Sequence, residues 1–245
     1  MLFGKVPVLK TASPLRLPYR RPLLSLLLIA LAFSCGIELI IYLERPRRTY
    51  ETSYLDDLSK RYCQFNTADE QNTANAGAYF QGTEIYYRIY EQESDCTSDT
   101  AQINRYNENT PSTAAQYLKE TKKYYRLTTT DVSKQPLIGR YSSNANVRFR
   151  LQSYGGTTDP AVLAVNGISL GTPLRDIRIL AAKRGFDREN ISADDEDVQK
   201  GSSSSGVHEF WCVNFYAVSY GNDASLKSLY SELEPLGFIK IEKKP

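Results

Sequence analysis

The longest apolar stretch of the chain runs from Leu23 to Leu43 and is interrupted by one charged residue, Glu38. A helix rises about 1.5 Å per residue, so this stretch is long enough to cross a hydrocarbon core of about 30 Å. The pattern therefore predicts a transmembrane helix over residues 22–43. It is preceded by a short basic tail, residues 1–21, and followed by a polar remainder.

Basic residues around this anchor predict its orientation. Five Lys or Arg residues precede the apolar stretch, and three follow it closely, at Arg45, Arg47 and Arg48. Because such residues are retained on the cytoplasmic side, the bias predicts a cytoplasmic N-terminus and an extracytoplasmic C-terminal domain. We expect the protein to lie in a bacterial inner membrane.

Two processing alternatives remain open. Residues 23–33 also suit the apolar region of a cleaved signal peptide, with Ala32 and Ser34 at the small-residue positions before Cys35. Cys35 is alternatively a lipid-attachment site. The apolar pattern continues beyond Cys35, whereas a mature N-terminus is usually polar, which favours an uncleaved anchor. Glu38 then lies either near the outer head groups or against another transmembrane helix.

Beyond the anchor, alternation of apolar and polar side chains predicts β-strands. Successive side chains of a strand point to opposite faces, so alternation is typical of a strand with one buried face. The predicted strands cover residues 84–90, 124–129, 147–151, 207–220 and 239–241. The pair Asn166-Gly167 between apolar residues predicts a two-residue hairpin turn.

Helical spacing of apolar residues predicts four amphipathic helices. They cover residues 52–62, 111–122, 173–184 and 224–233. The last two each follow a strand and end in a Gly-Phe pair, at Gly185 and Gly237, which suggests a strand–helix pseudo-repeat. Residues 66–78 and 93–110 are polar and lack an apolar period, so we expect loops there.

These elements together predict an α+β fold, with antiparallel strands and two or more packed amphipathic helices behind the anchor. The turn-forming sequence GGTTDP at residues 155–160 is the best candidate for a break within the exported domain. We therefore divide this domain into an N-terminal part, residues 44–156, and a C-terminal α+β part, residues 157–245.

Charge argues against one class of partner. The chain has 30 Lys and Arg against 28 Asp and Glu, and without the tail and anchor the balance is 25 against 27. The two signs are mixed along the sequence, whereas a nucleic-acid-binding domain carries a basic stripe, so no nucleic-acid partner is expected. The 18 tyrosines suit strands that present aromatic cross-strand pairs to water.

Three cysteines lie beyond the anchor. In an oxidising compartment Cys63 and Cys96 are expected to form a disulfide across a polar loop. Cys212 lies in an apolar strand and is expected to be a buried free thiol. His208 shares a strand face with Cys212, but the four-residue separation of about 13 Å is too long for a nucleophile–base pair.

The chain offers no motif for a metal or cofactor. Residues 194–197 are acidic, but a calcium loop beginning at Asp195 would have Lys200 at its sixth position and Gly206 at its twelfth, where Gly and Glu are required. We therefore expect a solvated loop. No catalytic, cofactor-binding or metal-ligating residue is predicted.

The preferred interpretation is a non-enzymatic interaction or assembly module, anchored by residues 22–43, whose exported domain binds another envelope protein. The alternative is a membrane-tethered hydrolase that uses loop carboxylates, namely Asp95, Asp99, Asp194 or Asp197. Two such carboxylates with raised pKa values in one pocket would favour the enzyme. An apolar surface patch would favour the interaction module.

Overall fold

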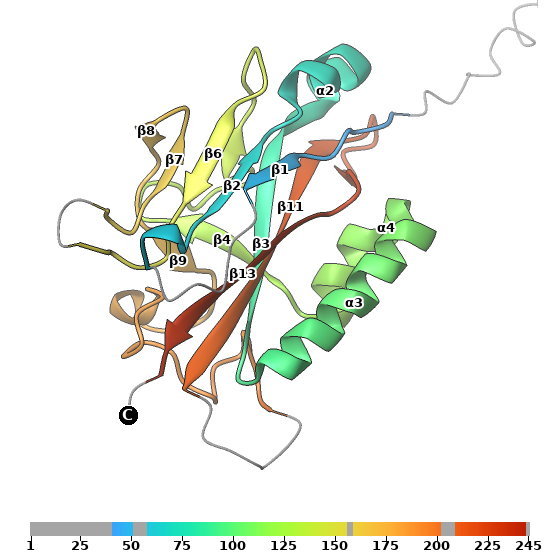
Figure 1. The fold of residues 1–245 in the computed structure, drawn as a ribbon. Helices are drawn as coiled ribbons and strands as arrows, with labels where there is room; N and C mark the ends of the chain where they lie inside the picture. Colours follow the sequence, from blue (N-terminus) through green and yellow to red (C-terminus); the bar gives the residue numbers. More distant parts are fainter. Residues whose placement is uncertain (1–40, 51–57, 156–158, 202–208, 244–245) are drawn as a thin grey trace, which may run out of the picture. The chain divides into compact units, whose positions relative to one another are not determined.

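The computed structural model describes residues 41–50, 58–155, 159–201 and 209–243. These residues form an α+β fold of antiparallel sheets and a few helices, as the sequence predicts (Figure 1). The tail and most of the predicted anchor, residues 1–40, lie outside the described residues. In the part of the chain that is described, no helix is long and apolar enough to cross a membrane.

The strands form two sheets. The smaller, antiparallel sheet has the order β1 (Arg47–Tyr50), β2 (Cys63–Asn66), β6 (Asn146–Phe149), β7 (Leu163–Val165), β8 (Ile168–Ser169). The larger has the order β12 (Ser228–Tyr230), β11 (Phe210–Asn222), β3 (Phe80–Tyr90), β4 (Tyr125–Thr129), β9 (Pro173–Arg175). Three further strands extend it, β13 (Glu234–Glu242) on β11, and β5 (Ile138–Gly139) and β10 (Val198–Gln199) on β3.

The described residues also form helices and single helical turns. They are α2 (Asp69–Ala76), α3 (Glu93–Asn109), α4 (Pro111–Gln116), the π-turn η3 (Tyr117–Thr121), and the 3₁₀ turns η1 (Leu58–Lys60), η2 (Gly77–Tyr79) and η4 (Ala181–Lys183). Helix α4 begins at a proline, which suits the first turn because the missing N–H has no partner there anyway.

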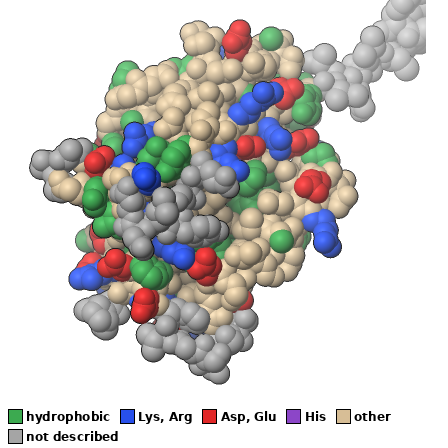
Figure 2. All heavy atoms as spheres, in the orientation of Figure 1, with side chains coloured by type: hydrophobic (Ala, Val, Ile, Leu, Met, Phe, Trp, Pro, Cys, Tyr) green, Lys and Arg blue, Asp and Glu red, His purple; other side chains and the backbone are tan. Residues whose placement is uncertain are grey.

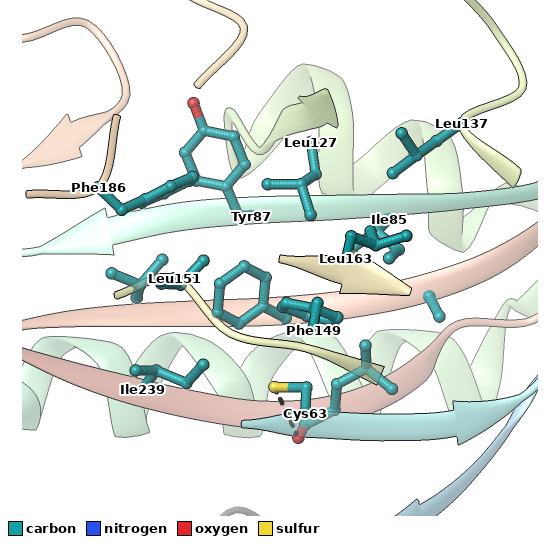
Figure 3. Close-up of a cluster of buried hydrophobic side chains, with 14 of the residues drawn as sticks. Cys63, Ile85, Tyr87, Leu127, Leu137, Phe149, Leu151, Leu163, Phe186 and Ile239 are labelled. Carbon is teal, nitrogen blue, oxygen red and sulfur yellow. Dashed lines mark hydrogen bonds between the residues drawn. The ribbon is translucent and has the colours of Figure 1, made fainter. Parts of the chain in front are cut away.

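The main apolar core lies between the two sheets. Phe149 of the smaller sheet meets Phe215 of the larger one edge-on, with ring centroids 5.1 Å apart. Tyr87 and Phe186 make a second edge-on contact, also at 5.1 Å. Figure 3 shows these aromatic and aliphatic side chains filling the space between the strands. Their removal from water is the principal favourable term for this fold.

The two sheets meet on both sides of this core. On one side the chain passes from β8 into β9 through Gly171, which has a φ of +96°. A Cβ at this position would lie 2.3 Å from the Thr130 hydroxyl, so only glycine fits. On the other side β13 lies beside β1 and β2, and the Arg48 amide donates to Glu234 over 2.8 Å.

Helices α3 and α4 cover the opposite face of the larger sheet, where a second apolar cluster forms. Strand β3 was predicted to be half-buried, but it is buried on both faces for this reason. Its tyrosines, predicted to face water, are buried too. Tyr90 donates to Asp99 over 2.6 Å, and Tyr216 of β11 donates to Asn104 over 3.1 Å.

Helix α3 occupies residues 93–109 and α2 occupies residues 69–76, within the segments 93–110 and 66–78 where loops were predicted. The buried side of α3 carries, at helical spacing, Cys96, Asp99, Ile103 and Asn107. Half of these are polar, so a search for apolar periodicity misses the helix. Asn107 is buried because its amide both donates to the Leu233 carbonyl (3.1 Å) and accepts from the Leu233 N–H (2.9 Å).

The helix predicted over residues 173–184 is wrong. Its first residues form β9, which pairs with β4, and only η4 is helical. Arg175 explains the difference, since its fully buried side chain needs the hydrogen-bond partners that an extended backbone brings to it. Leu180, predicted to be buried, is 73% exposed.

The helix predicted over residues 224–233 is also wrong. A turn at residues 223–227 leads into β12, which pairs with the end of β11. Leu226 lies at the tip of this hairpin with a φ of +63° and is 83% exposed. These residues pair with β11 as a strand, although their apolar side chains are spaced as in a helix. Because both helices are absent, the predicted pseudo-repeat is absent as well.

Other predicted elements are confirmed. Strands β4, β6, β11 and β13 and helix α4 overlap the predicted segments. The Asn166-Gly167 turn joins β7 to β8 with φ values of +50° and +81°, as a two-residue hairpin requires. Strands β6 and β7 pair across residues 155–160. Both sheets therefore combine strands from residues 44–156 with strands from residues 157–245.

Two predicted helices lie only partly within the described residues. Residues 41–46 are not helical, so a membrane helix predicted to reach Leu43 must end earlier. Of the helix predicted over 52–62, residues 51–57 lie outside the described part. The remainder forms η1 and then enters β2.

The expected Cys63–Cys96 disulfide is wrong. Cys63 lies in the core between the sheets, whereas Cys96 lies on the helix-covered face of the larger sheet. The two cysteines form no disulfide. Because residues 93–109 are a helix and not a loop, Cys96 is fixed on its buried side. Cys212 is a buried thiol, as predicted.

We expect these thiols to resist alkylation in the folded protein. Burial raises the pKa of the Cys96 thiol and raises that of Cys212 to about 12, so little reactive thiolate is present at neutral pH. Iodoacetamide should leave Cys63, Cys96 and Cys212 unmodified in native protein and modify all three in urea, as read by peptide mass spectrometry. A Cys63–Cys96 cross-linked peptide would contradict the structure.

Candidate functional site

The carboxylates of the hydrolase alternative do not converge. Asp99 accepts a hydrogen bond from Tyr90, on the helix-covered face of β3. Asp197 accepts one from Tyr87 (2.8 Å), on the opposite face. Asp95 lies in the first turn of α3. The larger sheet therefore separates Asp99 from Asp197, so these two carboxylates cannot act on one bond.

The acidic stretch at residues 194–197 is only partly a solvated loop. Asp194 is exposed and pairs with Lys200, which lowers its pKa. Asp197, by contrast, has no exposed surface. It accepts from Nε of Arg175 over 2.8 Å, while Asp195 accepts from Nη2 of the same guanidinium over 2.8 Å.

Each charged group of this buried cluster has a counter-charge and hydrogen-bond partners. Burial alone would lower the pKa of Arg175, but the hydrogen bonds and charges of Asp197 and Asp195 raise it instead. The Asn190 carbonyl accepts a further hydrogen bond from Nη1 over 2.8 Å. Every group in the cluster is engaged by the protein itself, so we assign it a structural role.

A second buried acidic group is left without such partners. Glu84 lies in β3 on the helix-covered face, has no exposed surface, and neither carboxylate oxygen accepts a hydrogen bond. The nearest guanidinium nitrogen, of Arg126, is 4.0 Å away. Burial raises the pKa of Glu84 from 4.5 to about 8, while Arg126, the Leu137 amide and Lys119 offset only part of the rise.

Close to Glu84 is a lysine–tyrosine pair. Lys119 donates to the Tyr230 hydroxyl over 2.8 Å. Burial raises the pKa of Tyr230, but the hydrogen bond and charge of Lys119 outweigh it and the net pKa is lowered. Groups with such shifted pKa values can serve in proton transfer. Glu84, however, has no surface that a substrate could contact in this structure.

The helices carry an open groove on their outer side. It has a volume of about 540 Å³ and is lined by residues of α3 and η3 and by Thr110, which joins α3 to α4; among them are Gln102, Arg105, Tyr106, Asn109 and Tyr117. The rings of Tyr106 and Tyr117 stack with centroids 4.0 Å apart and planes 8° from parallel. The groove therefore presents a preformed aromatic surface.

Two contacts fix this aromatic pair. The Tyr106 hydroxyl lies 3.1 Å from the Thr113 hydroxyl, and Lys122 places its ammonium 5.7 Å from the Tyr117 ring centroid. Lys122 in turn donates to Gln102 over 2.7 Å. Arg105 is exposed, and its guanidinium makes no ion pair with any residue that the structure describes. We call this site the α3–α4 groove.

Surface charge elsewhere is mixed. On the face drawn in Figure 2, Lys and Arg side chains lie among Asp and Glu side chains. Arg45, just after the predicted anchor, lies 3.7 Å from Glu232 and 3.6 Å from Glu234. Within the described residues, no group of three His, Cys, Asp or Glu could hold a metal ion. His208 lies outside the described residues.

No family model matches this chain. Comparison with curated proteins and with solved structures also finds no match. A function must therefore be argued from the chain's own geometry.

Sequence reasoning missed both notable sites for identifiable reasons. The sequence does not indicate the α3–α4 groove, because the polar residues 93–110 predict a loop where α3 lies. Glu84 had a usable signal, since it is a charged residue in the apolar run EIYYRIY of β3. Interpreting this signal requires knowing that β3 is buried on both faces. Alternation of apolar and polar residues by itself indicates only one buried face.

Proposed function

We propose that this protein is a single-pass membrane-anchored interaction module, not an enzyme, whose exported domain binds another envelope protein at the α3–α4 groove. The observation that carries this proposal is the stacked Tyr106–Tyr117 pair beside Arg105. Tyrosine and arginine are the side chains that most often dominate the free energy of protein–protein association.

The geometry of the groove favours a protein segment as the ligand. The two rings are already stacked, so binding loses less side-chain entropy than it would with two free tyrosines. The groove is shallow and lies on the outside of a helix pair, whereas small-molecule sites enclose most of their ligand.

The charge of Arg105 specifies the partner further. A guanidinium forms two parallel hydrogen bonds with a carboxylate, and Arg105 has no carboxylate partner among the described residues. We therefore propose that the partner segment places an acidic side chain next to an apolar or aromatic one. The aromatic side chain would extend the Tyr106–Tyr117 stack.

The location proposed for this module follows from the sequence. We propose that the apolar residues from 22 onward hold it in a bacterial inner membrane, with residues 1–21 in the cytoplasm. The structure starts to describe the chain at Ile41, and residues 22–40 still fall within the 17–25 residues that a transmembrane helix needs.

Site-specific photo-crosslinking in native membranes tests the proposal. A photoreactive phenylalanine derivative at Tyr106 of the full chain should yield one defined adduct with an envelope protein, identified by mass spectrometry. R105E should reduce this adduct about tenfold, since loss of a charge-assisted pair costs on the order of 1.5–3 kcal/mol.

Two matched controls accompany this experiment. The same photoreactive residue at Leu180, which is 73% exposed, should give no adduct of that mass. R178E reverses another exposed charge away from the groove and should leave the Tyr106 adduct unchanged. Equal adducts at both positions, or an adduct indifferent to R105E, would refute the groove as the binding site.

The hydrolase alternative has less support. Two of its carboxylates, Asp99 and Asp197, lie on opposite faces of the larger sheet, and Glu84, whose pKa is raised to about 8, is inaccessible. The raised pKa of Glu84 bears on the stability of the fold instead.

A further inference from the structure

The last residues of the predicted membrane span, which the structure describes from Ile41 onward, are docked on the folded domain. Leu43 is 3% exposed and packs against Ala76 and Phe80, with Ile41 and Leu229 beside them. This contact is part of the apolar structure of the domain. It leaves no free linker between residue 41 and the fold.

Hydrogen bonds fix the next residue as firmly. The Glu44 amide donates to the side-chain oxygen of Asn72 over 2.6 Å, and the Asn72 amide donates back to the Glu44 carbonyl over 3.0 Å. The Ser219 hydroxyl donates to the same carbonyl over 2.6 Å. The backbone at the start of the domain is therefore held by both α2 and β11.

This attachment has a consequence for orientation. A flexible linker would let the domain tumble above a membrane, because each linker residue adds conformational freedom. Here residues 41–44 are held against the domain. If the preceding residues span the bilayer, the end of the domain that holds Leu43 must lie at the membrane surface.

The same end of the domain carries the β11–β12 hairpin. Gly221 pairs with Phe80 and with Leu229, both part of the cluster around Leu43. Figure 1 shows the chain entering at the end of the domain where α2 and the end of β11 lie. The hairpin turn, residues 223–227, projects just beyond this pairing.

The turn is ordered and presents an apolar side chain. The Asp223 carboxylate accepts from the amides of Ser225 (2.7 Å) and Lys227 (2.9 Å), and the Asp223 amide donates to the Lys227 carbonyl (2.8 Å). Leu226 at its tip is 83% exposed, the largest exposed fraction among the large apolar side chains described. Tyr42, beside Leu43, is 50% exposed.

We propose that Leu226 and Tyr42 form a lipid-contact face that inserts into the interfacial region of the membrane in which the chain is anchored. This inference rests on the membrane anchoring proposed above and assigns the exposed apolar tip a ligand, the lipid surface. Tyrosine is favoured at membrane interfaces, a leucine gains from leaving water, and the adjoining Lys227 can pair with lipid phosphate.

The test uses the full chain reconstituted in phospholipid vesicles. Leu226 and Tyr42 are each replaced by tryptophan, with Trp211, which is 6% exposed, as the constant background. Lipids brominated near the head groups quench tryptophan at interfacial depth. The emission of the added tryptophan is the emission of L226W or Y42W minus that of the wild type. We expect it to fall about twofold or more, because interfacial side chains lie within about 5–10 Å of the acyl boundary.

The matched control is L180W, because Leu180 is 73% exposed but lies at the other end of the fold. The backbone amide of Arg178, two residues before Leu180, donates to Glu196 near β10. Strand β10 pairs with the end of β3 that lies opposite Phe80. L180W should be unquenched. Equal quenching of L226W and L180W would overturn the lipid-contact face.

Alkaline carbonate extraction of the same membranes separates the two proposals. Protein that stays in the pellet while L226W is unquenched would overturn the lipid-contact face and leave the anchor intact. Protein released into the supernatant would overturn the anchor, and the lipid-contact face with it. Retention together with selective quenching of L226W and Y42W supports both.

Discussion

The free energy of unfolding is expected to fall by several kcal/mol between pH 5 and pH 8.5 because of Glu84. This carboxyl is fully buried, accepts no hydrogen bond, and has a pKa raised from 4.5 to about 8, chiefly by burial. Between these two values the folded protein holds a proton that the unfolded chain has released. At about 1.36 kcal/mol per pKa unit, the full effect is about 5 kcal/mol at most.

The sign follows from proton linkage. Stability rises with pH where the unfolded state binds more protons, and here the folded state binds more. Stability is therefore lost as pH rises from about 4.5 and reaches its floor above about 8, where Glu84 is ionised in the fold. Groups with lowered pKa values, such as Asp194, act in the opposite sense at lower pH.

The variant E84Q should remove this dependence. Its unfolding free energy should exceed that of the wild type by about 2–5 kcal/mol at pH 8.5, since a neutral amide avoids burying an ion, and should differ far less at pH 5. Urea unfolding of the detergent-solubilised chain, followed by Trp211 fluorescence, measures both values. E108Q, at an exposed glutamate of α3, is the control and should change little. Parallel pH profiles for wild type and E84Q would contradict the assignment.

Replacing Arg175 by methionine should destabilise the protein by about 3–5 kcal/mol at neutral pH. The guanidinium is fully buried against Asp197 and Asp195, so its loss leaves buried carboxylates without a counter-charge. The remaining hydrogen bond to Asp197, from Tyr87, cannot compensate a full charge. The same urea unfolding measurement applies.

Two comparisons make this second prediction specific. The double variant R175M/D197N should recover part of the loss at pH 7. R178M, at an exposed position three residues on, should stay within about 0.5 kcal/mol of the wild type. A double variant no more stable than R175M would point to packing instead of charge.

Much of the strand content was readable from the sequence. Alternation located β4, β6, β11 and β13, and the Asn166-Gly167 turn located the β7–β8 hairpin, because these signals depend on near neighbours along the chain. The helix at Pro111 was readable for the same reason. Apolar spacing also predicted two helices, at 173–184 and 224–233, that the structure replaces with turns and strands.

The candidate site was not readable in the same way. Helix α3 buries Asp99 and Asn107, whose partners Tyr90, Lys122 and Leu233 come from other parts of the chain. Polar residues can be buried wherever such partners exist, and sequence alone does not show the partners. The α3–α4 groove could therefore be seen only once α3 was placed.

By itself the sequence determined the class of fold and the span of apolar residues near the N-terminus, since composition and periodicity carry both. Tertiary structure decided which strands are covered on two faces, that Cys63 and Cys96 lie on opposite sides of a sheet, and that Arg175 and Glu84 are buried. These outcomes depend on contacts between residues far apart in the chain, and burial of a charge is settled only by what packs around it.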